Sequence, residues 1–445
     1  MKFMAKNIYL VSLGCDKNRV DGEVMIGKLR QAGFTVANDP DAAQVIIVNT
    51  CGFIRDAVQE SIDLVLELAE YKKQGKCEAL VIVGCMSERY RDEIKESIPE
   101  SDAILGVGQH DLLVQEVGRL IGLPENGEVF AFLTDSDPYL ARLAARTDDA
   151  IPHVAYVKIS EGCDNHCTYC TIPAIRGAYT SRTMENILEE CRLLIDMGAR
   201  ELVLVAQDTA LYGMDIYGEK RLPQLMREIA KLSEEIWIRI MYAYPEHITP
   251  ELIDAIAGTS QICKYIDMPI QHSEDSVLSQ MGRASTRKDL LSLIATFREK
   301  IPGIAIRTTL MVGFPGETAE NFRNMYEFVR EVKFDRLGVF PYSREEGTPA
   351  ATFPKQVRAE VKQARLARIM TLQQKIHFEK QKQYVGKTLP VIVDSIPYTG
   401  RTQWDAFEVD AVVKFTSSAS LTPGEIYPVL ITSTDQYDLR GMCKT

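Results

Sequence analysis

The sequence predicts an α/β protein of three domains. These are an N-terminal parallel α/β domain over residues 5–125, a central open (β/α)6 partial barrel over 145–375 and a small C-terminal β-barrel over 377–445. Short Val- and Ile-rich runs alternate with amphipathic helical stretches through the first two regions, as in buried parallel sheets. The last region alternates apolar and polar residues between Gly- and Pro-containing turns, which is typical of antiparallel strands. A chain of 445 residues is also too long for one ordinary core.

The first domain contains four short apolar runs that predict parallel strands. A stretch between the second and third runs repeats apolar residues at helical spacing and predicts a helix over 57–74. The predicted strands are residues 8–13, 45–48, 80–83 and 103–105.

Cysteines follow three of these strands. Cys15, Cys51 and Cys85 each come at the carboxyl end of a strand with a glycine beside them. Ligands of open α/β sheets bind at that edge, and glycine lets the backbone approach a bulky inorganic group. A single Cys at a strand end is most often a small buried apolar residue, but three in register predict a metal site. The other four cysteines are predicted to be structural or incidental, with Cys443 near a mobile terminus; they are Cys77, Cys191, Cys263 and Cys443.

The central domain repeats the strand–helix alternation six times. Six units are too few for a closed eight-fold barrel, so an open barrel is expected, with its catalytic groups at the carboxyl ends of the strands. The predicted strands are 155–159, 202–205, 238–242, 265–268, 304–312 and 337–340, and the predicted helices include 184–197, 222–233, 287–300 and 317–332.

Three more cysteines follow the first central strand, at the spacing C-x3-C-x2-C. Cys163, Cys167 and Cys170 lie in one short loop. Iron–sulfur clusters are held by Cys thiolates, usually four, so three thiols leave one iron without a protein ligand. An open position is typical of a reactive metal site. Two other interpretations stay open: a zinc knuckle whose fourth ligand lies elsewhere, and a disulfide pair with one spare thiol.

The spacing of this loop resembles the signature of the radical S-adenosylmethionine (SAM) enzymes. The resemblance implies a [4Fe-4S] cluster whose free iron is chelated by SAM. Polar groups at the same end of the barrel are then candidates for holding SAM: Gln207, Asp208, Gln271, His272, Gly313, Gly316 and Glu317. Each also has a structural interpretation, because the two glycines shape a tight turn and Glu317 favours the start of a helix.

Three residues near the cysteine loop are further candidates. Tyr169 is placed to lay its ring or backbone beside the adenine of SAM. Arg176 and Arg182 follow the loop and either contact the SAM carboxylate or are simply solvated, and the sequence favours neither interpretation.

The C-terminal region follows a predicted linker helix over 358–383 and contains predicted strands at 386–394, 407–415 and 426–431. Its order in the chain resembles the TRAM module, an OB-like barrel. From residue 377 to 445 it carries seven Lys and Arg against eight Asp and Glu, a net charge of −1. A barrel that tracks RNA should carry a basic groove, which this composition does not predict.

Taken together, the two cysteine triads, the open barrel and the terminal module resemble the methylthiotransferase family of radical SAM enzymes over essentially the whole chain. The run 265–272 resembles the D-x-P-x-Q-H pattern of the ribosomal-protein (RimO-like) branch. The tRNA branch more often shows P-x-Q-S-G-S, from which 272–274 departs. The segments 159–173 and 175–177 point to the same ribosomal-protein branch.

The resemblance implies methylthiolation of an aspartate β-carbon on the small-subunit ribosomal protein S-twelve. That carbon holds an unactivated C–H bond that no side-chain acid or base can break, so a cofactor must supply the chemistry. As the resemblance implies, one [4Fe-4S] cluster reduces SAM to give a 5′-deoxyadenosyl radical, and a second cluster on Cys15, Cys51 and Cys85 presents the sulfur. An electron donor such as flavodoxin or ferredoxin is implied. The alternatives are a tRNA adenosine as target and a non-catalytic iron–sulfur redox sensor.

The composition agrees with a cytoplasmic protein that has a basic partner. The formal net charge is −11, which disfavours a protein whose main task is to bind nucleic acid phosphates. No apolar run approaches the length of a membrane span, and no signal-peptide pattern is seen. Ten cysteines clustered at ligand spacing fit a reducing compartment better than a disulfide framework.

Overall fold

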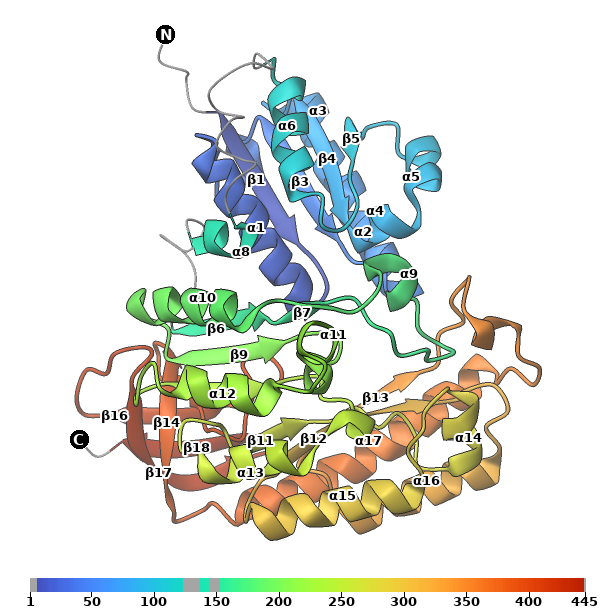
Figure 1. The fold of residues 1–445 in the computed structure, drawn as a ribbon, viewed down its shortest axis with the longest axis vertical. Helices are drawn as coiled ribbons and strands as arrows, with labels where there is room; N and C mark the ends of the chain where they lie inside the picture. Colours follow the sequence, from blue (N-terminus) through green and yellow to red (C-terminus); the bar gives the residue numbers. More distant parts are fainter. Residues whose placement is uncertain (1–5, 123–136, 144–152, 444–445) are drawn as a thin grey trace. The chain divides into compact units, whose positions relative to one another are not determined.

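The computed structural model describes residues 6–122, 137–143 and 153–443 (Figure 1). The chain divides into two compact units. The first, here called the N-terminal unit, is Met1–Ala150 together with Thr171–Ala178, and the second, the barrel unit, is Ile151–Cys170 and Tyr179–Thr445. The domain boundaries predicted above remain predictions. None of the helices in the described residues is both long and apolar enough to cross a membrane.

The N-terminal unit is built on a parallel five-stranded sheet in the order β2-β1-β3-β4-β5. All four strands predicted here are confirmed, and the two-residue strand β2 is an addition that its length hid from the sequence pattern. The strands are β1 (Asn7–Ser12), β2 (Thr35–Val36), β3 (Val45–Thr50), β4 (Ala79–Gly84) and β5 (Ala103–Ile104).

Helices cover both faces of this sheet. α1 (Asp16–Gln31) and α6 (His110–Leu120) pack on one face, and α2 (Arg55–Ala69) and α5 (Arg91–Ser97) pack on the other. Every residue of β3 and β4 is buried, as expected for strands covered on both sides. The predicted helix 57–74 is divided at Glu70, where α2 ends and α3 begins. The shorter elements are η1 (Pro40–Ala42), α3 (Tyr71–Gln74), α4 (Cys85–Arg89), α8 (Pro138–Ala141) and α9 (Ile172–Arg176).

The barrel unit begins with six parallel strands, and all six predicted strands are confirmed. They form two three-stranded ladders, β6-β9-β10 and β11-β12-β13, which a parallel bridge between Ile238 and Ile262 connects. The sheet is therefore open, with edges at β6 and β13. The strands are β6 (Val154–Lys158), β9 (Glu201–Val205), β10 (Trp237–Ile240), β11 (Tyr265–Asp267), β12 (Ala305–Val312) and β13 (Arg336–Pro341).

Helices connect these strands, and the four predicted helices are present. α15 begins where predicted because Thr286 and Asp289 form a capping box that satisfies its first amides. The longer helices are α10 (Met184–Asp196), α12 (Leu222–Ala230), α13 (Pro250–Gly258), α15 (Arg287–Lys300) and α16 (Ala319–Val332). The shorter elements are β7 (Ser160–Glu161), β8 (Thr180–Ser181), η3 (Thr209–Leu211), α11 (Met214–Tyr217), η4 (Pro245–His247), α14 (Asp275–Gln280) and η5 (Pro349–Thr352).

After α17 (Ala359–Lys382) the chain forms a small closed barrel. Its strand order is β14-β15-β16-β18-β17. Its strands are β14 (Thr388–Ser395), β15 (Thr399–Arg401), β16 (Val413–Ser417), β17 (Ile426–Asp435) and β18 (Asp438–Cys443).

One prediction for this barrel was wrong. The predicted strand 407–415 exists only from Val413, because Asp410 accepts the amide of Ala406 and the preceding residues form turns. Cys443 closes β18 and is 2% exposed, and the terminus predicted to be mobile after it lies outside the described residues.

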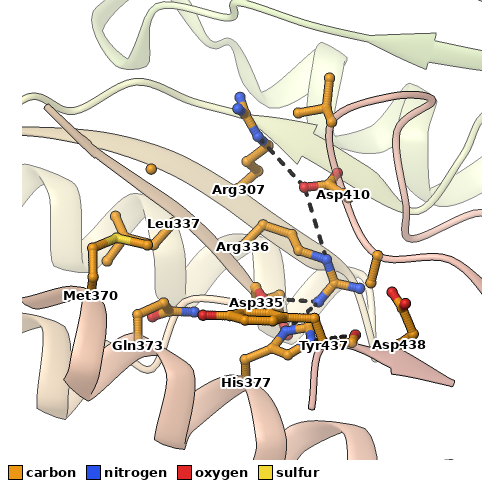
Figure 2. Close-up of a pocket in the computed structure, with 13 residues that line it drawn as sticks. Arg307, Asp335, Arg336, Leu337, Met370, Gln373, His377, Asp410, Tyr437 and Asp438 are labelled. Atoms are coloured by element: carbon orange, nitrogen blue, oxygen red, sulfur yellow. Dashed lines mark hydrogen bonds and ion pairs between the residues drawn. The ribbon is translucent and has the colours of Figure 1, made fainter. Parts of the chain in front are cut away.

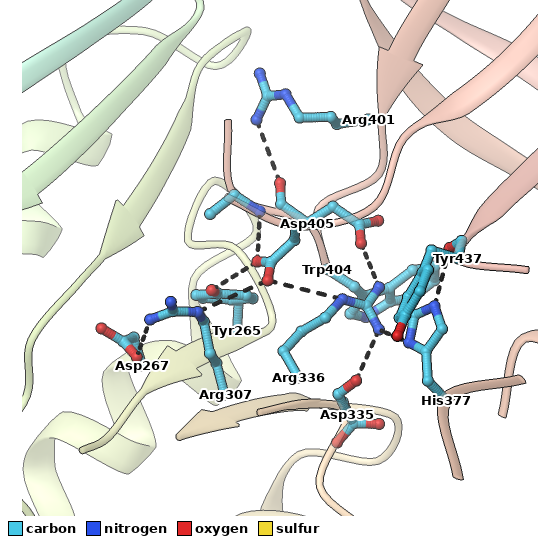
Figure 3. Close-up of polar contacts among 12 residues, drawn as sticks. Tyr265, Asp267, Arg307, Asp335, Arg336, His377, Arg401, Trp404, Asp405 and Tyr437 are labelled. Carbon is cyan, nitrogen blue, oxygen red and sulfur yellow. Dashed lines mark hydrogen bonds and ion pairs between the residues drawn. The ribbon is translucent and has the colours of Figure 1, made fainter. Parts of the chain in front are cut away.

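Within the barrel unit, buried ion pairs join the closed barrel to the partial barrel. Glu201 on β9 pairs with Arg239 on β10 and with Arg401 on β15, each at 2.6 Å. All three side chains are at most 1% exposed. Figure 3 shows a second contact, between Arg336 of β13 and Asp405 of the closed barrel. The closed barrel is thus fixed to the strands by ion pairs between buried or largely buried side chains.

A cavity of about 290 Å³ lies beside this junction (Figure 2). Arg307 and Arg336 from the beginnings of β12 and β13 line it, with Asp410 between them and His377 of α17 below. It therefore lies at the N-terminal ends of these strands, whereas ligands of such sheets bind at the carboxyl ends.

Candidate functional site

In the N-terminal unit, Cys15, Cys51 and Cys85 lie at the carboxyl ends of three neighbouring strands. Cys15 is the N-cap residue of α1 after β1, Cys51 directly follows β3, and Cys85 is the first residue of α4 after β4. Because β1, β3 and β4 are adjacent and parallel, the three thiols come to one edge of the sheet, as the sequence predicts.

Glycines let the loops that carry these thiols touch. A Cβ atom on Gly14 would lie 2.9 Å from the Cys51 sulfur, and one on Gly52 would lie 2.6 Å from the Cys85 carbonyl oxygen. Gly84 has φ +97°, and a Cβ there would lie 2.5 Å from the Asn49 side chain. Each glycine is therefore required by a close approach, and Gly14 and Gly84 also by a left-handed backbone.

The thiols of this site differ in their surroundings. Cys15 is exposed, Cys51 is partly buried and Cys85 is buried. Burial raises the pKa of Cys85 to about 11, although the nearby Arg176 guanidinium opposes the rise. The Arg176 Nη2 atom lies 3.3 Å from the Cys85 sulfur, and its Nη1 atom donates to Asp21 at 3.0 Å. Arg176 thus belongs to the N-terminal unit. It is not solvated, so that one of its two predicted interpretations is wrong.

In the barrel unit, Cys163, Cys167 and Cys170 lie in the loop after β7. Cys163 and Cys167 are each 9% exposed, and Cys170 is partly buried. The amide of Thr168 donates to the Met281 carbonyl at 3.0 Å, and a Cβ on Gly282 would lie 2.6 Å from the His166 carbonyl. The loop is therefore held against the end of α14, with its thiols at the carboxyl end of the first central strand, as predicted.

Tyr244 contacts one thiol of this loop directly. Its hydroxyl lies 2.5 Å from the Cys167 sulfur, and the Arg283 guanidinium lies 3.6 Å from the centre of its ring. Glu246 fixes Arg283 through an ion pair of 3.0 Å. Burial raises the pKa of the Tyr244 hydroxyl far above its usual range, so the phenol stays protonated and can donate to a thiolate.

The two candidates after β9 hold the loop from its other side. The Asp208 carboxylate accepts from Asn165 in the loop at 3.0 Å and contacts His247 at 2.5 Å. Gln207 donates to Glu161, just before the loop, at 3.0 Å. Its buried Oε1 has no hydrogen-bond partner among the described residues, so one acceptor remains for a ligand.

Gln271 and His272 follow β11. Gln271 adopts φ +69°, an unusual conformation for a residue with a side chain, and its backbone pairs with β12. His272 is fully buried and accepts the Glu274 amide on Nδ1. Burial, with the Arg365 cation nearby, lowers the pKa of His272 to about 3, so it is neutral near pH 7.

The turn after β12 is organised by Glu317. Its carboxylate accepts the amides of Gly313, at 2.5 Å, and Phe314, and it forms an ion pair of 2.7 Å with Arg365. Gly313 has φ +73° and is covered by the Lys362 side chain, and Gly316 has φ +86°. The two glycines therefore shape the turn, as considered for them. Glu317 instead holds the turn together, because Thr318 and not Glu317 caps the start of α16.

Two further candidates are already engaged by the protein. Tyr169 packs against a buried cluster that includes Met281, Phe314 and Tyr342. Arg182 forms a buried ion pair with Glu190 at 2.6 Å and donates to the Lys158 carbonyl, so it is not solvated.

All ten cysteines lie within the described residues, and none forms a disulfide. The described residues also contain no group of three or more His, Cys, Asp or Glu side chains close enough to hold a single metal ion. A tetrahedral zinc site needs sulfurs about 2.3 Å from one ion. An iron–sulfur cluster contains several irons, so its thiol ligands lie farther apart than those of a single ion. Both triads consist only of thiols, the ligands that iron–sulfur clusters use.

Sequence reasoning missed Tyr244, Arg283 and Asn18. Tyr244 and Arg283 both come from segments far along the chain: Tyr244 contacts the cysteine loop only in the fold, and Arg283 packs on the Tyr244 ring. No local pattern marks them. Asn18 connects two of the cysteine loops, because its Nδ2 donates to the Leu13 carbonyl at 2.7 Å and lies 3.3 Å from the Thr50 carbonyl. Its position three residues after a strand-end Cys was a local signal for this role.

Comparison with known protein families gives three matches in order along the chain. Residues 7–106 match the uncharacterized protein family UPF0004, residues 157–329 match the radical SAM superfamily, and residues 385–443 match the TRAM domain. These matches and the observed fold confirm the predicted fold class.

Curated relatives are similar over nearly the whole chain. The ribosomal protein uS12 methylthiotransferase RimO of Desulforamulus reducens is 46% identical over 442 residues, covering 98% of this chain and 99% of its own length. The proteins of the same name from Clostridioides difficile and Desulfitobacterium hafniense are 45% and 43% identical, covering 98% and 99% of this chain and 98% and 99% of their own lengths.

Solved structures share the fold at low identity. TsrM of Kitasatospora setae, a radical S-adenosylmethionine methyltransferase solved with cobalamin and a [4Fe-4S] cluster, gives a TM-score of 0.57 at 16% identity. That comparison covers 78% of this chain and 74% of TsrM. The cobalamin-dependent enzyme OxsB, solved with S-adenosylmethionine, gives 0.51 at 13% identity, covering 85% of this chain and 56% of OxsB.

Proposed function

Because the chain belongs to the family of ribosomal protein uS12 methylthiotransferases, we propose that it adds a methylthio group to an aspartate β-carbon of uS12. The observation that carries the proposal is the presence of two three-thiol sites, each at the carboxyl edge of a parallel sheet. The reaction needs two kinds of chemistry, removal of a hydrogen atom and delivery of sulfur. Two separate sites with an incomplete set of protein ligands match that need.

We assign the radical chemistry to the barrel unit. Cys163, Cys167 and Cys170 would hold a [4Fe-4S] cluster, and SAM would occupy the position that three thiols leave open. Together the cluster and SAM supply the one-electron chemistry needed to break an unactivated C–H bond. Tyr244 would keep donating to the Cys167 sulfur and so stabilise its negative charge.

The SAM contacts proposed from the sequence remain proposals. Gln207 is supported by its unpartnered buried oxygen beside the cysteine loop, which suits the ammonium group of SAM. Gln271 is supported by its strained backbone at a strand end. Tyr169 keeps its predicted place beside the adenine, and Gly313 and Gly316 remain candidates for holding SAM. The support for all three is one buried cluster, which contains Phe314 of the glycine turn and against which Tyr169 packs.

We assign sulfur delivery to the N-terminal unit. Cys15, Cys51 and Cys85 would hold a second [4Fe-4S] cluster, and the exposed position of Cys15 fits a site that a substrate must reach. The contacts at Gly14, Gly52 and Gly84 bring the three loops together without a fourth cysteine between them. Three thiols would again leave one iron of such a cluster open to carry sulfur.

The partner is a basic protein in this proposal. The chain carries a net charge of −11, and ribosomal proteins are strongly basic, so complementary charge favours their encounter. The net charge of −1 in residues 377–445 does not favour tRNA. A low-potential electron donor, a flavodoxin or ferredoxin, would supply the electrons.

Mass spectrometry of a strain that lacks the gene tests the proposal. We expect uS12 from that strain to lack one methylthio group, which the wild-type gene restores and Cys163→Ala does not. Digested tRNA from the same strain should be unchanged. A normal uS12 together with a missing methylthio group on a tRNA adenosine would replace the proposed target by tRNA.

A further inference from the structure

We propose that Arg176 is a positioning residue of the N-terminal site, which donates to the sulfur of Cys85 and raises the reduction potential of the cluster there. The inference rests on the proposed function, because it needs Cys85 to be a cluster ligand. Hydrogen bonds and positive charge near a cluster sulfur favour the reduced, more negative state. The structure supplies both at Cys85 from one side chain.

The geometry of Arg176 is that of a fixed donor. The side chain is buried, 1% exposed, and its two terminal nitrogens have different partners. Nη1 donates to the Asp21 carboxylate at 3.0 Å, while Nη2 lies 3.3 Å from the Cys85 sulfur and 3.4 Å from Asn18 Oδ1. Asp21 therefore holds Nη1 in place, and Nη2 is directed at the Cys85 sulfur.

Asn18 connects this arginine to the other two cysteine loops. Its Nδ2 donates to the carbonyl of Leu13, two residues before Cys15, at 2.7 Å and lies 3.3 Å from the carbonyl of Thr50, which precedes Cys51. Its Oδ1 faces Arg176. The Asn18 amide thus contacts the backbone just before Cys15 and Cys51, and the Arg176 guanidinium contacts the sulfur of Cys85.

A purely structural role does not account for this arrangement. Burying a charged pair seldom adds net stability over an apolar replacement, because desolvation offsets the attraction. The same carboxylate and cation become useful when the third partner is a thiolate that carries charge. Arg176 also lies only six residues after Cys170 in the sequence, so the segment that follows one proposed cluster ligand supplies the donor to the other site.

The test uses the full chain with Cys163, Cys167 and Cys170 all changed to Ala, so that only the N-terminal site can hold a cluster. After anaerobic reconstitution with iron and sulfide, the midpoint potential is measured by redox titration followed by electron paramagnetic resonance. We expect Arg176→Gln to lower the reduction equilibrium constant about tenfold, or about 59 mV for a one-electron couple. Arg176→Lys should shift it less because the charge remains.

Arg119→Gln is the matched control. It removes the same charge from the surface of the same unit, where Arg119 pairs with Glu116 and is 55% exposed. A potential for Arg176→Gln equal to that of the parent, or a shift as large for Arg119→Gln, overturns the inference. A parent that binds no iron would instead overturn the proposed second cluster.

Asp21→Asn keeps the test decisive if Arg176→Gln does not fold. This change retains the guanidinium but releases Nη1 from its carboxylate. A shifted potential in Asp21→Asn and in Arg176→Lys supports the inference, and unchanged potentials in both overturn it.

Discussion

Each of the two cysteine sites presents three thiols at the carboxyl edge of a parallel sheet, but the two sites are assembled in different ways. Cys163, Cys167 and Cys170 share one short loop, whereas Cys15, Cys51 and Cys85 come from three loops after three strands. The first site depends on local chain spacing. The second exists only when β1, β3 and β4 are paired in register.

The sites also differ in what touches their sulfurs. A charged guanidinium contacts Cys85, and a neutral phenol contacts Cys167. A cation stabilises added negative charge more strongly than a neutral donor does. We therefore expect a higher reduction potential for the proposed sulfur site than for the proposed radical site, which must pass its electron to SAM.

The largest expected effect separates the two sites by function. Cys163→Ala should abolish formation of 5′-deoxyadenosine from SAM, because the open iron that binds SAM is lost. Cys85→Ala should retain SAM cleavage but stop methylthio transfer. Chromatography of the nucleoside product and mass spectrometry of uS12 measure the two reactions, and equal loss of both in Cys85→Ala would contradict the division.

The next effect tests the non-local assembly. Gly84→Ala should remove the cluster proposed for the N-terminal site, and so roughly half of the iron bound per chain, because the new Cβ would lie 2.5 Å from Asn49 and 2.7 Å from the Thr50 carbonyl. Gly33→Ala is the matched control: its φ is +87° but nothing lies within 4 Å. Iron analysis after reconstitution measures both, and full iron in Gly84→Ala would contradict the close approach.

A smaller effect is expected at the phenol. Tyr244→Phe removes one hydrogen bond to the Cys167 sulfur, which is worth about 1 kcal/mol and therefore about fivefold in the rate of SAM cleavage. Tyr212→Phe serves as the control, because it removes a buried hydrogen bond to the Arg182 carbonyl elsewhere in the same unit. A similar slowing in both variants would assign the effect to stability alone.

The smallest effect on either site should come from the junction of the two barrels. Glu201→Gln leaves Arg239 and Arg401 facing each other without a carboxylate and should destabilise the apo-protein by about 3–5 kcal/mol. The ratio of iron in the two sites should not change. Glu228→Gln, on an exposed pair with Lys231, should cost less than about 1 kcal/mol in the same denaturant titration.

The junction also predicts a pH dependence. Burial alone raises the pKa of Glu201, but Arg239 and Arg401 reverse this and hold it below the usual range. Because the folded pKa lies below the unfolded value of about 4.3, the stabilisation is present above that pH and is lost as the pH falls through the folded value. Glu201→Gln should remove this part of the acid sensitivity, and an unchanged profile would contradict it.

The sequence predicted strands and cysteine positions well because both follow from periodicity and spacing. The buried Val and Ile runs became β3, β4 and the six barrel strands, and the thiols came to the edges that parallel topology dictates. In the closed barrel the alternation of apolar and polar residues wrongly predicted a strand at 407–412, where Asp410 forms ion pairs with Arg307 and Arg336 on other strands. Contacts of that kind have no local signature.

The candidate sites show the same limit. Their ligands were predicted by position in the chain, but Tyr244 and the direction in which Arg176 points depend on contacts between distant segments. Arg182 illustrates the point: like Arg176 it follows the cysteine loop in the sequence, yet it forms an ion pair with Glu190.

The segment Thr171–Ala178 belongs to the N-terminal unit although the residues on both sides of it belong to the barrel unit. A cut after Ala150 therefore would not release a complete N-terminal unit, because Arg176 would stay with the other piece. Exchange of this unit between related enzymes, in the laboratory or during evolution, has to include those eight residues or lose the donor to Cys85.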